Sequence, residues 1–459
     1  MTADVCIVGG GYTGLWTAVE IKRQDPSADV VLIEARRVGD GASGRNGGWA
    51  TGWYDELPEL IEKFGLDQAL WLARACADGI GEIRRTAEEF SFDCHFRQQG
   101  ALWTSTAPAH DGVWERAVQA CRATGNADKL EVLDPAEAAR RTGSPLVRCA
   151  ARQTDGAAIH PAWLVVGLLQ AATALGVRVH EHTPALKLRR GAFPSVVTPA
   201  GRISARHVVL ATNARLLALP ALRRAAASVG SHVVATAPLG ERAKELPFHH
   251  GELVGDSNML VHYAQVTRSG RLVFGRGGGY VGAAGRPSAS ELTGRPWERR
   301  VEADLRRFFP QLADVPITHR WGGAVDRAPG HLPFAGTLDD HWTVTYALGY
   351  SGNGVVPSVL MGRILSRLAL GRRDEYTSCA LVSGPPDYFP PEPFRTVGAY
   401  LVQAAIARAE RAEERGRRPD PLSALGRRLV RTTIPRPLEP RLRRRPAYPP
   451  RKSEGGVAP

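Results

Sequence analysis

Residues 5–21 read VCIVGGGYTGLWTAVEI, and residues 30–35 read VVLIEA. The apolar run before the glycines has the composition of a strand buried on both faces, and the apolar positions after them recur at helical spacing. The second stretch begins with another such strand, which ends at Glu34. The order strand, glycine turn, helix, strand predicts one right-handed βαβ unit at the start of the chain.

The glycines of this turn have the spacing of a dinucleotide-binding site. Gly9 permits a tight turn, Gly11 lets the backbone approach a pyrophosphate, and Gly14 lets the helix touch the strand. The helix N-terminus offers unpaired N–H groups to the phosphates. A carboxylate at Glu34 accepts hydrogen bonds from ribose hydroxyls and repels a 2′-phosphate, which favours FAD or NAD over NADP.

A polar, glycine-rich loop, GDGASGRNGG at residues 39–48, follows where an NAD-binding domain would place its next helix. Such a loop can pass close to a flat ring system and offer it backbone N–H groups. With VVLATNA at 208–214, HLPFAGTL at 331–338 and ALGYSGNGV at 347–355, it resembles the D-amino-acid-oxidase-like (DAO) family of FAD-dependent oxidoreductases. GASGRNGG is most similar to the branch that contains γ-glutamylputrescine oxidoreductases and aminophosphonate oxidoreductases.

The resemblance implies which residues contact FAD. The ADP half would be held by Gly9, Gly11, Gly14 and Glu34, with Ala35 and Arg36 beside the adenosine, and with Ala211 and Thr212 on the returning strand. The stretch from the pyrophosphate to the flavin would be lined by Ser43, Arg45, Asn46, Gly47 and Gly48. The flavin O2 edge would receive backbone donors from Gly349, Tyr350, Ser351, Gly352, Asn353, Gly354 and Val355.

We expect the FAD to be bound non-covalently. Family members with a covalent flavin attach it through a His or Cys near these loops, and this chain has neither between Glu34 and Trp71. Between Trp321 and Val355 it has no Cys. We interpret the histidines of that interval as surface residues.

The resemblance also implies a fold: an α/β chain whose Rossmann-type FAD-binding domain is interleaved with an α+β substrate domain containing a mixed, largely antiparallel sheet. A hairpin is predicted at VTRSGRLVFG, residues 266–275, and a helix is predicted to start at Pro161. We assign to the FAD-binding domain residues 1–55, 150–215 and 340–384. We assign to the substrate domain residues 56–149 and 216–339.

Residues 385–459 form a basic C-terminal extension. We predict two amphipathic helices, at about 395–415 and 421–431, followed by a disordered Pro/Arg-rich end. Residues 401–459 contain 15 basic and 6 acidic side chains, so most of the net charge of +13 lies here. The charge therefore does not indicate nucleic-acid binding by the body. Peripheral contact of this tail with a membrane is an alternative that we do not favour.

Other features exclude further classes of protein. The longest apolar stretch has 14 residues, at 164–177, whereas a membrane-spanning helix needs about 20. The N-terminus shows no signal-peptide pattern, so we expect a cytoplasmic protein. The six scattered cysteines predict neither disulfides nor a metal site.

The substrate wall should come from the antiparallel sheet. We expect it to present His262, Tyr263, Phe274 and Arg276, with Trp49 from the glycine-rich loop and Trp321 as a weaker candidate. Arg276 draws attention because a buried guanidinium needs an anionic partner, such as a substrate carboxylate or phosphonate. As catalytic residues we select Arg276, His262, Tyr263 and Trp49.

The predicted reaction is oxidation of the C–N bond of a small-molecule amine or amino acid, with a polyamine derivative or an aminophosphonate as candidate substrates. Hydride passes to flavin N5, and the imine hydrolyses. The electron acceptor is O2, or a quinone or carrier. Two alternatives are oxidation of an alcohol or 2-hydroxy acid, and a non-catalytic flavoprotein subunit.

Overall fold

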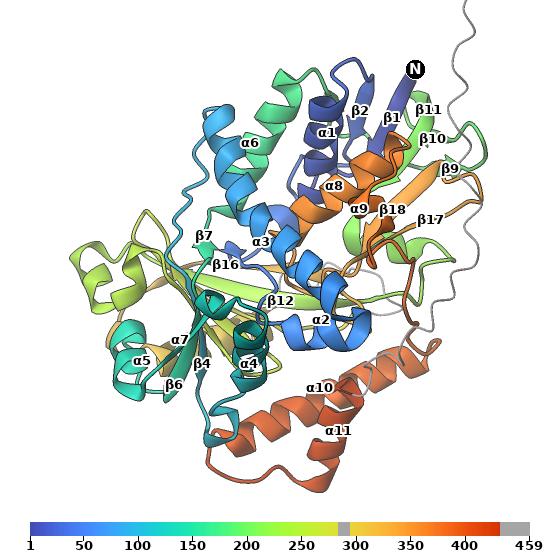
Figure 1. Cartoon of the computed structure of the whole chain (residues 1–459). Coiled ribbons are helices and arrows are strands. Elements are labelled where there is room, and N and C mark those ends of the chain that lie inside the picture. Colours follow the sequence, from blue (N-terminus) through green and yellow to red (C-terminus); the bar gives the residue numbers. More distant parts are fainter. Residues whose placement is uncertain (283–293, 432–459) are drawn as a thin grey trace, which may run out of the picture.

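The computed structural model describes residues 1–282 and 294–431, with side chains up to residue 426. It contains two large sheets with helices around them (Figure 1). The predicted disordered end of the chain lies outside the described residues. The fold class, a Rossmann-type α/β sheet joined to a mixed sheet with helices, is confirmed.

The first sheet begins with the predicted βαβ unit. Its described strands follow the order β17-β18-β11-β1-β2-β8, and β10 and β9 extend it from β11. Their bounds are β1 Thr2–Val8, β2 Val30–Ile33, β8 Arg178–His180, β9 Lys187–Arg189, β10 Ser195–Thr198, β11 Gly201–Leu210, β17 Phe334–Thr337 and β18 Val344–Leu348. β1 lies at the centre, parallel to both β11 and β2.

Both faces of this sheet are covered. Val5 and Ile7 of β1 pack in an apolar cluster with helices on one face, and Cys6 and Val8 pack in a second cluster on the other. Successive side chains of a strand point to opposite faces, so a strand covered on both sides needs an unbroken apolar run. The composition of residues 5–8 meets this requirement.

Most of the helices surround the two sheets. The last two, α10 and α11, form a separate pair. Their bounds are α1 Tyr12–Gln24, α2 Leu57–Phe64, α3 Leu66–Glu89, α4 Glu115–Ala123, α5 Pro135–Thr142, α6 Pro161–Ala174, α7 Arg295–Phe308, α8 Pro357–Ala369, α9 Glu375–Ser378, α10 Phe394–Glu413 and α11 Pro421–Arg431. The side chain of His160 caps α6 by accepting from Trp163 N at 3.3 Å, and Pro161 takes its first position as predicted. No helix in residues 1–282 or 294–431 is long and apolar enough to cross a membrane.

The second sheet is mostly antiparallel. Its described strands follow the order β16-β12-β15-β14-β13-β4-β6-β5. Their bounds are β4 Ala101–Ser105, β5 Leu130–Leu133, β6 Cys149–Gln153, β12 Ala227–Thr236, β13 Leu253–Asp256, β14 His262–Val266, β15 Leu272–Arg276 and β16 Ile317–Arg327. β14 and β15 form the predicted hairpin. A short third sheet pairs β3, Trp49–Ala50, with β7, Ala157–Ala158.

Sheet membership changes close to the domain boundaries that we assigned. β6 ends at Gln153 in the second sheet, although we placed 150–215 in the FAD-binding domain. β17 begins at Phe334 in the first sheet, although we placed the boundary at 340. The division into domains otherwise remains a prediction.

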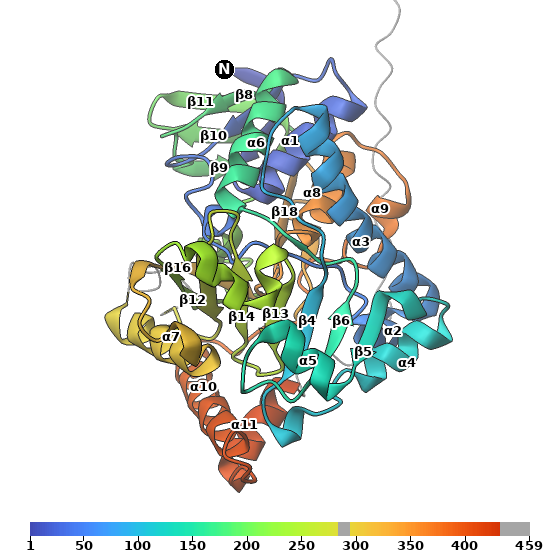
Figure 2. The ribbon, with the colours of Figure 1, turned by 90° about the vertical axis from the view of Figure 1, so that its left-hand side faces the viewer.

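The C-terminal extension packs beside the second sheet. Figures 1 and 2 show α10 and α11 at the end of the molecule opposite the N-terminus and the first sheet. Both lie close to where the sequence predicted two helices. α10 shares an apolar cluster with Leu260, which lies in the turn between β13 and β14.

We expect Gly14→Ala to destabilise the fold. A Cβ at position 14 would lie 2.0 Å from the carbonyl oxygen of Gly9, so α1 would have to move away from β1. Overpacking of this kind costs about 1–3 kcal/mol. The lowered free energy of unfolding is measured by urea denaturation followed by tryptophan fluorescence.

Gly81→Ala is the matched control, because Gly81 also lies inside a helix, α3. There the new Cβ would meet only the flexible end of Arg85, at 3.1 Å. We expect unchanged or slightly raised stability, since alanine favours helix by about 1 kcal/mol over glycine. Equal stability of both variants would contradict the close approach of α1 and β1.

Candidate active site

The glycine turn between β1 and α1 is tied to the end of β2. Gly9 N donates to Ile33 O at 2.8 Å, and Gly10 N donates to Oε2 of Glu34 at 2.9 Å. Oε1 of Glu34 accepts a further bond from Arg36 N at 3.0 Å. The half-buried carboxylate is thereby fixed beside the turn, and its remaining lone pairs can accept from a ligand hydroxyl.

The returning strand β11 ends against the same turn. Ala211 N donates to the last carbonyl of β1 at 2.8 Å. Thr212 then precedes a short 3₁₀ helix, η4, Asn213–Ala218. Asn213 has φ 51°, so this asparagine does adopt the left-handed conformation that its residue type tolerates.

The loop at residues 39–48 packs on the start of α1. The N–H of Tyr12 donates to Oγ of Ser43 at 2.9 Å. Asn46 braces the loop from within, because its Oδ1 accepts from Gly48 N at 2.9 Å. The loop is therefore held in place by its own side chains and by the helix N-terminus.

The loop at residues 349–355 is held by Asp326, at the end of β16. Oδ2 of Asp326 accepts from Gly349 N at 2.5 Å and from Tyr350 N at 3.3 Å. Its Oδ1 accepts from Nδ2 of Asn213 at 3.3 Å. Burial raises the pKa of Asp326 to about 6, although these N–H donors oppose the rise.

The glycine turn and the loops at 39–48 and 349–355 are called the three loops. They lie at the carboxyl ends of the parallel strands, and side chains connect them to one another and to the second sheet. The hydroxyls of Thr13 and Tyr350 lie 2.6 Å apart and share a hydrogen bond. Trp321 Nε1 donates to Arg45 O at 2.8 Å. In an open α/β sheet, ligands bind at this edge.

A cavity of about 740 Å³ opens beside these loops. Of the residues expected to contact a cofactor, it is lined by Arg45, Asn46, Gly47, Ser351, Gly352, Asn353 and Val355. The others lie along the glycine turn and the loop bases: Gly9, Gly11, Gly14, Glu34, Ala35, Arg36, Ser43, Gly48, Ala211, Thr212, Gly349, Tyr350 and Gly354. Ala35 and Arg36 are exposed at the end of β2.

Two of the aromatic side chains that we expected on the substrate wall line this cavity, Trp49 and Tyr263. Their rings meet edge to face with centroids 6.4 Å apart. The Tyr263 ring fits between the two backbones of Gly47 and Gly275, where an added Cβ would lie 2.4 Å and 2.1 Å from it. Its hydroxyl lies 3.0 Å from Oγ of Ser231.

His262, Phe274 and Arg276 do not line the cavity, against our expectation. His262 pairs with Arg276 across the hairpin, whereas Tyr263 pairs with Gly275. Because side chains alternate along a strand, His262, Phe274 and Arg276 lie on the face that packs against α7, and Tyr263 lies on the cavity face. Trp321 does not line the cavity either; it covers Arg45.

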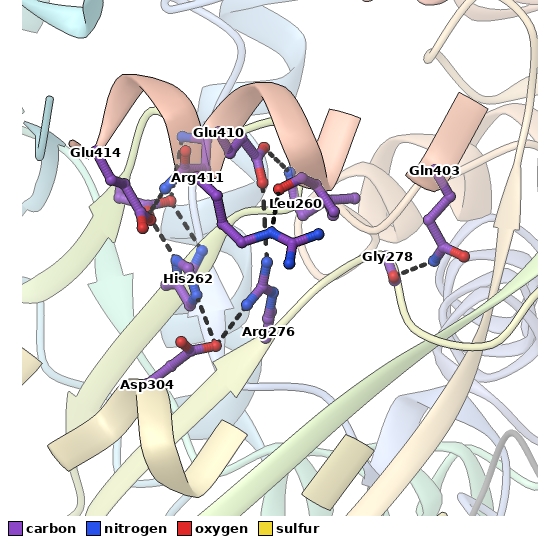
Figure 3. A network of polar contacts seen from close by, with 12 residues as sticks. Leu260, His262, Arg276, Gly278, Asp304, Gln403, Glu410, Arg411 and Glu414 are labelled. Carbon is purple, nitrogen blue, oxygen red and sulfur yellow. Dashed lines mark hydrogen bonds and ion pairs between the residues drawn. The ribbon is translucent and has the colours of Figure 1, made fainter. Parts of the chain in front are cut away.

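The buried groups on the far face form a charged network (Figure 3). Nδ1 of His262 lies 2.6 Å from Oδ2 of Asp256, and its Nε2 lies 3.2 Å from Oδ2 of Asp304. Arg276 donates to Asp304 at 2.5 Å and lies 3.8 Å from Glu410 of α10. The anionic partner that buried Arg276 requires is thus supplied by the chain itself.

This network helps to hold α10 over the cavity. Oε1 of Glu410 accepts from Leu260 N at 3.0 Å, and Gln403 donates to the carbonyls of Gly278 and Gly279. Several residues of α10 line the cavity: Phe394, Arg395, Gly398, Ala399, Val402, Gln403 and Ile406. The C-terminal extension is therefore one wall of the site, a role that no sequence motif indicates.

The sequence analysis also did not identify several other side chains of the site. Asp326 is a single acidic residue in a strand, with no motif around it. Asp55, Trp103 and Gln153 line the cavity from segments far apart in the chain. Only the pairing of β4 with β6 brings Trp103 and Gln153 into the same sheet.

Known proteins resemble this chain in sequence and in fold. A family model described as "FAD dependent oxidoreductase" (DAO) matches residues 4–368. The γ-glutamylputrescine oxidoreductase of Escherichia coli K12 is 33% identical over 83% of this chain and 86% of its own length. The Rhizobium meliloti protein named "Probable oxidoreductase OrdL" is 34% identical over 81% and 84%. The glycine oxidase structure from Geobacillus kaustophilus superposes with a TM-score of 0.66 at 20% identity, covering 84% of this chain and 97% of that one.

The charged network makes stability depend on pH. Burial alone would lower the pKa of His262, but Asp256 and Asp304 outweigh it and raise the pKa to about 9, while Arg276 opposes them. Protonated His262 therefore stabilises the folded protein. This stabilisation is complete below about pH 6.5, the pKa of histidine in the unfolded chain, and it is lost as the pH rises through 9. Between pH 7 and pH 10 we expect the stability difference between the native protein and His262→Gln to shrink by about 2 kcal/mol. Urea denaturation of both proteins at each pH measures this difference in the free energy of unfolding.

His207→Gln is the control for this experiment. His207 is also buried, and burial lowers its pKa to about 4, so the ring stays neutral throughout the same pH range. We expect its stability difference from the native protein to be independent of pH. If the stability difference between the native protein and His262→Gln is also independent of pH, His262 is uncharged in the folded protein.

Proposed function

The chain belongs to the DAO family of FAD-dependent oxidoreductases, and from this premise we propose that it oxidises the C–N bond of a polyamine-derived amine. The observation that carries the proposal is the 33% identity to γ-glutamylputrescine oxidoreductase over most of both chains. The geometry supports it with a largely apolar cavity beside the three loops. When bound, FAD accepts the hydride that leaves the carbon bearing the amine.

The residues present fit FAD. Glu34 offers a fixed acceptor to the ribose hydroxyls, and the start of α1 offers backbone donors to the pyrophosphate. Residues 45–47, 351–353 and 355 line the cavity where the flavin ring would lie. Nε1 of Trp49, on the same wall, is a buried donor without a partner among the described residues, as expected where a polar ligand is to bind.

The chain's own contribution to the reaction is to bind and enclose the substrate. Trp49 and Tyr263 form an aromatic wall, and α10 closes the cavity with Val402 and Ile406. These surfaces exclude water and position a short alkyl chain against the loops. Tyr263 keeps its proton, because burial raises the pKa of its hydroxyl despite the hydrogen bond to Ser231.

Arg276 gives no support to an aminophosphonate substrate. The side chain that we expected to bind its anionic group lies outside the cavity and is paired with Asp304, although Arg45, Arg327 and Arg395 line the cavity. The electron acceptor stays open between O2 and a quinone or carrier.

We expect Glu34→Ala to weaken FAD binding. The substitution removes a charged acceptor of the ribose hydroxyls and of Gly10 N. A hydrogen bond to a charged group contributes about 1.5–3 kcal/mol, so Kd should rise by roughly 10- to 150-fold. Fluorescence titration of the apoprotein with FAD measures Kd, and acid precipitation should leave the FAD in solution.

Asp134→Ala is the matched control for this measurement. Asp134 also accepts from a backbone N–H, that of Glu137 at 2.9 Å, but it is exposed at the start of α5 beside the second sheet, away from the glycine turn. Its FAD affinity should equal that of the native protein. Equal affinity of Glu34→Ala would remove Glu34 from the cofactor site.

The proposed reaction is tested by anaerobic reduction of the bound flavin. We expect polyamines and their acylated derivatives to bleach the flavin absorbance faster than amino acids or aminophosphonates, and to release ammonia or an amine. The same panel includes alcohols and 2-hydroxy acids. Bleaching by these alone would support the alternative oxidation, and bleaching by none would support a non-catalytic flavoprotein.

A further inference from the structure

One part of the cavity lining comes from β4, β5 and β6 and from the segment between β3 and α2. We call the space beside it the lobe of the cavity, and its residues are Thr51, Asp55, Trp103, Leu130 and Gln153. Figure 2 shows these strands beside α2 and α4, at the edge of the second sheet. Neither the proposed FAD contacts nor the aromatic wall of Trp49 and Tyr263 uses this lobe.

Asp55 supplies a carboxylate without a counter-charge to this lobe. It lies between β3 and α2, and its Oδ1 is buried without a hydrogen-bond partner in the described residues. The charged groups that act most strongly on it are Glu56, Asp155 and Glu59, all carboxylates. Burial, and then Glu56, raise the pKa of Asp55 well above its usual range.

The lysines of the neighbourhood are engaged elsewhere, and the Arg327 guanidinium, which also lines the cavity, acts on Glu56. Lys129, which acts on Asp155, lies 3.0 Å from the carboxylate of Asp128 and above the ring of Tyr54. Lys63 donates to Gly330 O. Neither lysine therefore serves as a cationic partner of Asp55.

Two further side chains make the lobe a built site. Gln153 is 5% exposed and lines the cavity, and its side-chain amide lies beside the carboxylate of Asp155. Trp103 presents an indole to the same lobe, braced edge to face by Trp114 at 6.1 Å. A carboxylate and an indole in one cavity can together bind an ammonium group, through an ion pair and a cation–π contact.

We propose that Asp55 and Trp103 form a subsite for a second ammonium group of the substrate, remote from the carbon that is oxidised. The proposal rests on the proposed function, because it concerns an amine in the same cavity. The preferred substrate then carries two nitrogen groups, one beside the loops at 45–49 and 351–355 and one at Asp55. An ammonium group at Asp55 favours the carboxylate form of this side chain over its protonated form.

Probes for the subsite are α,ω-diaminoalkanes of three to eight carbons and the 1-aminoalkanes of equal length. Binding is measured by anaerobic calorimetry on the FAD-loaded protein after its flavin has been reduced with dithionite, so that no amine is oxidised during the titration. We expect at least one diamine to bind about 10-fold tighter than its monoamine. In Asp55→Asn this preference should be lost, while monoamine affinity changes less than twofold.

Glu62→Gln is the matched control. It removes an exposed carboxylate of α2 that pairs with Arg116 and does not line the cavity, and it should keep the diamine preference. Asp55→Ser repeats the test with a smaller side chain, in case asparagine disturbs the fold. A preference for diamines that persists without the Asp55 carboxylate, or equal binding of diamines and monoamines by the native protein, overturns the subsite.

Failure of the subsite is distinguishable from failure of the proposed function. If the flavin stays oxidised with every amine, the proposed oxidation is wrong, but the binding preference and its loss in Asp55→Asn still decide the subsite. If amines reduce the flavin while Asp55→Asn leaves the ratio of diamine to monoamine affinity unchanged, the reaction stands and the subsite is wrong.

Discussion

The buried carboxylate of Asp326 holds together three segments that the chain brings from far apart. It accepts from Gly349 and Tyr350 at the start of one loop and from Asn213 at the end of β11. Asp326 itself belongs to β16 of the second sheet, whereas β11 belongs to the first. Asp326 thus fixes the loop at 349–355 to the second sheet, and with Trp321, which donates to Arg45 O, it sets the relative position of the loops and the hairpin that border the cavity.

Much of the fold was predictable because local patterns specified it. The βαβ unit, the hairpin at 266–275 and the start of α6 each have turn or capping residues within a few positions. Our prediction for the side chains of β14 and β15 was wrong, because the alternation of a strand forbids His262 and Tyr263 from sharing a face. Partners that are distant in the sequence decide where the other side chains lie. Asp304 accepts the hydrogen bond of Arg276, and no residue near Arg276 in the sequence indicates this pairing.

The candidate site divides in the same way. The loops at 39–48 and 349–355 follow motifs that the family shares, and the cavity includes several of their residues. Asp55, Trp103 and Gln153 come from a loop and two paired strands, and only the folded chain places them together. Motifs therefore indicate where a shared cofactor binds, and tertiary packing decides what else enters the cavity.

The wall contributed by α10 lies beyond residue 368, where the family match ends. The cofactor loops and this wall are thus encoded in separate parts of the gene. Mutations in the last segment can reshape the substrate chamber without touching the glycine turn, Glu34 or Asp326. Selection, or an engineer exchanging this one helix between homologues, can change substrate preference while the oxidising machinery is inherited intact.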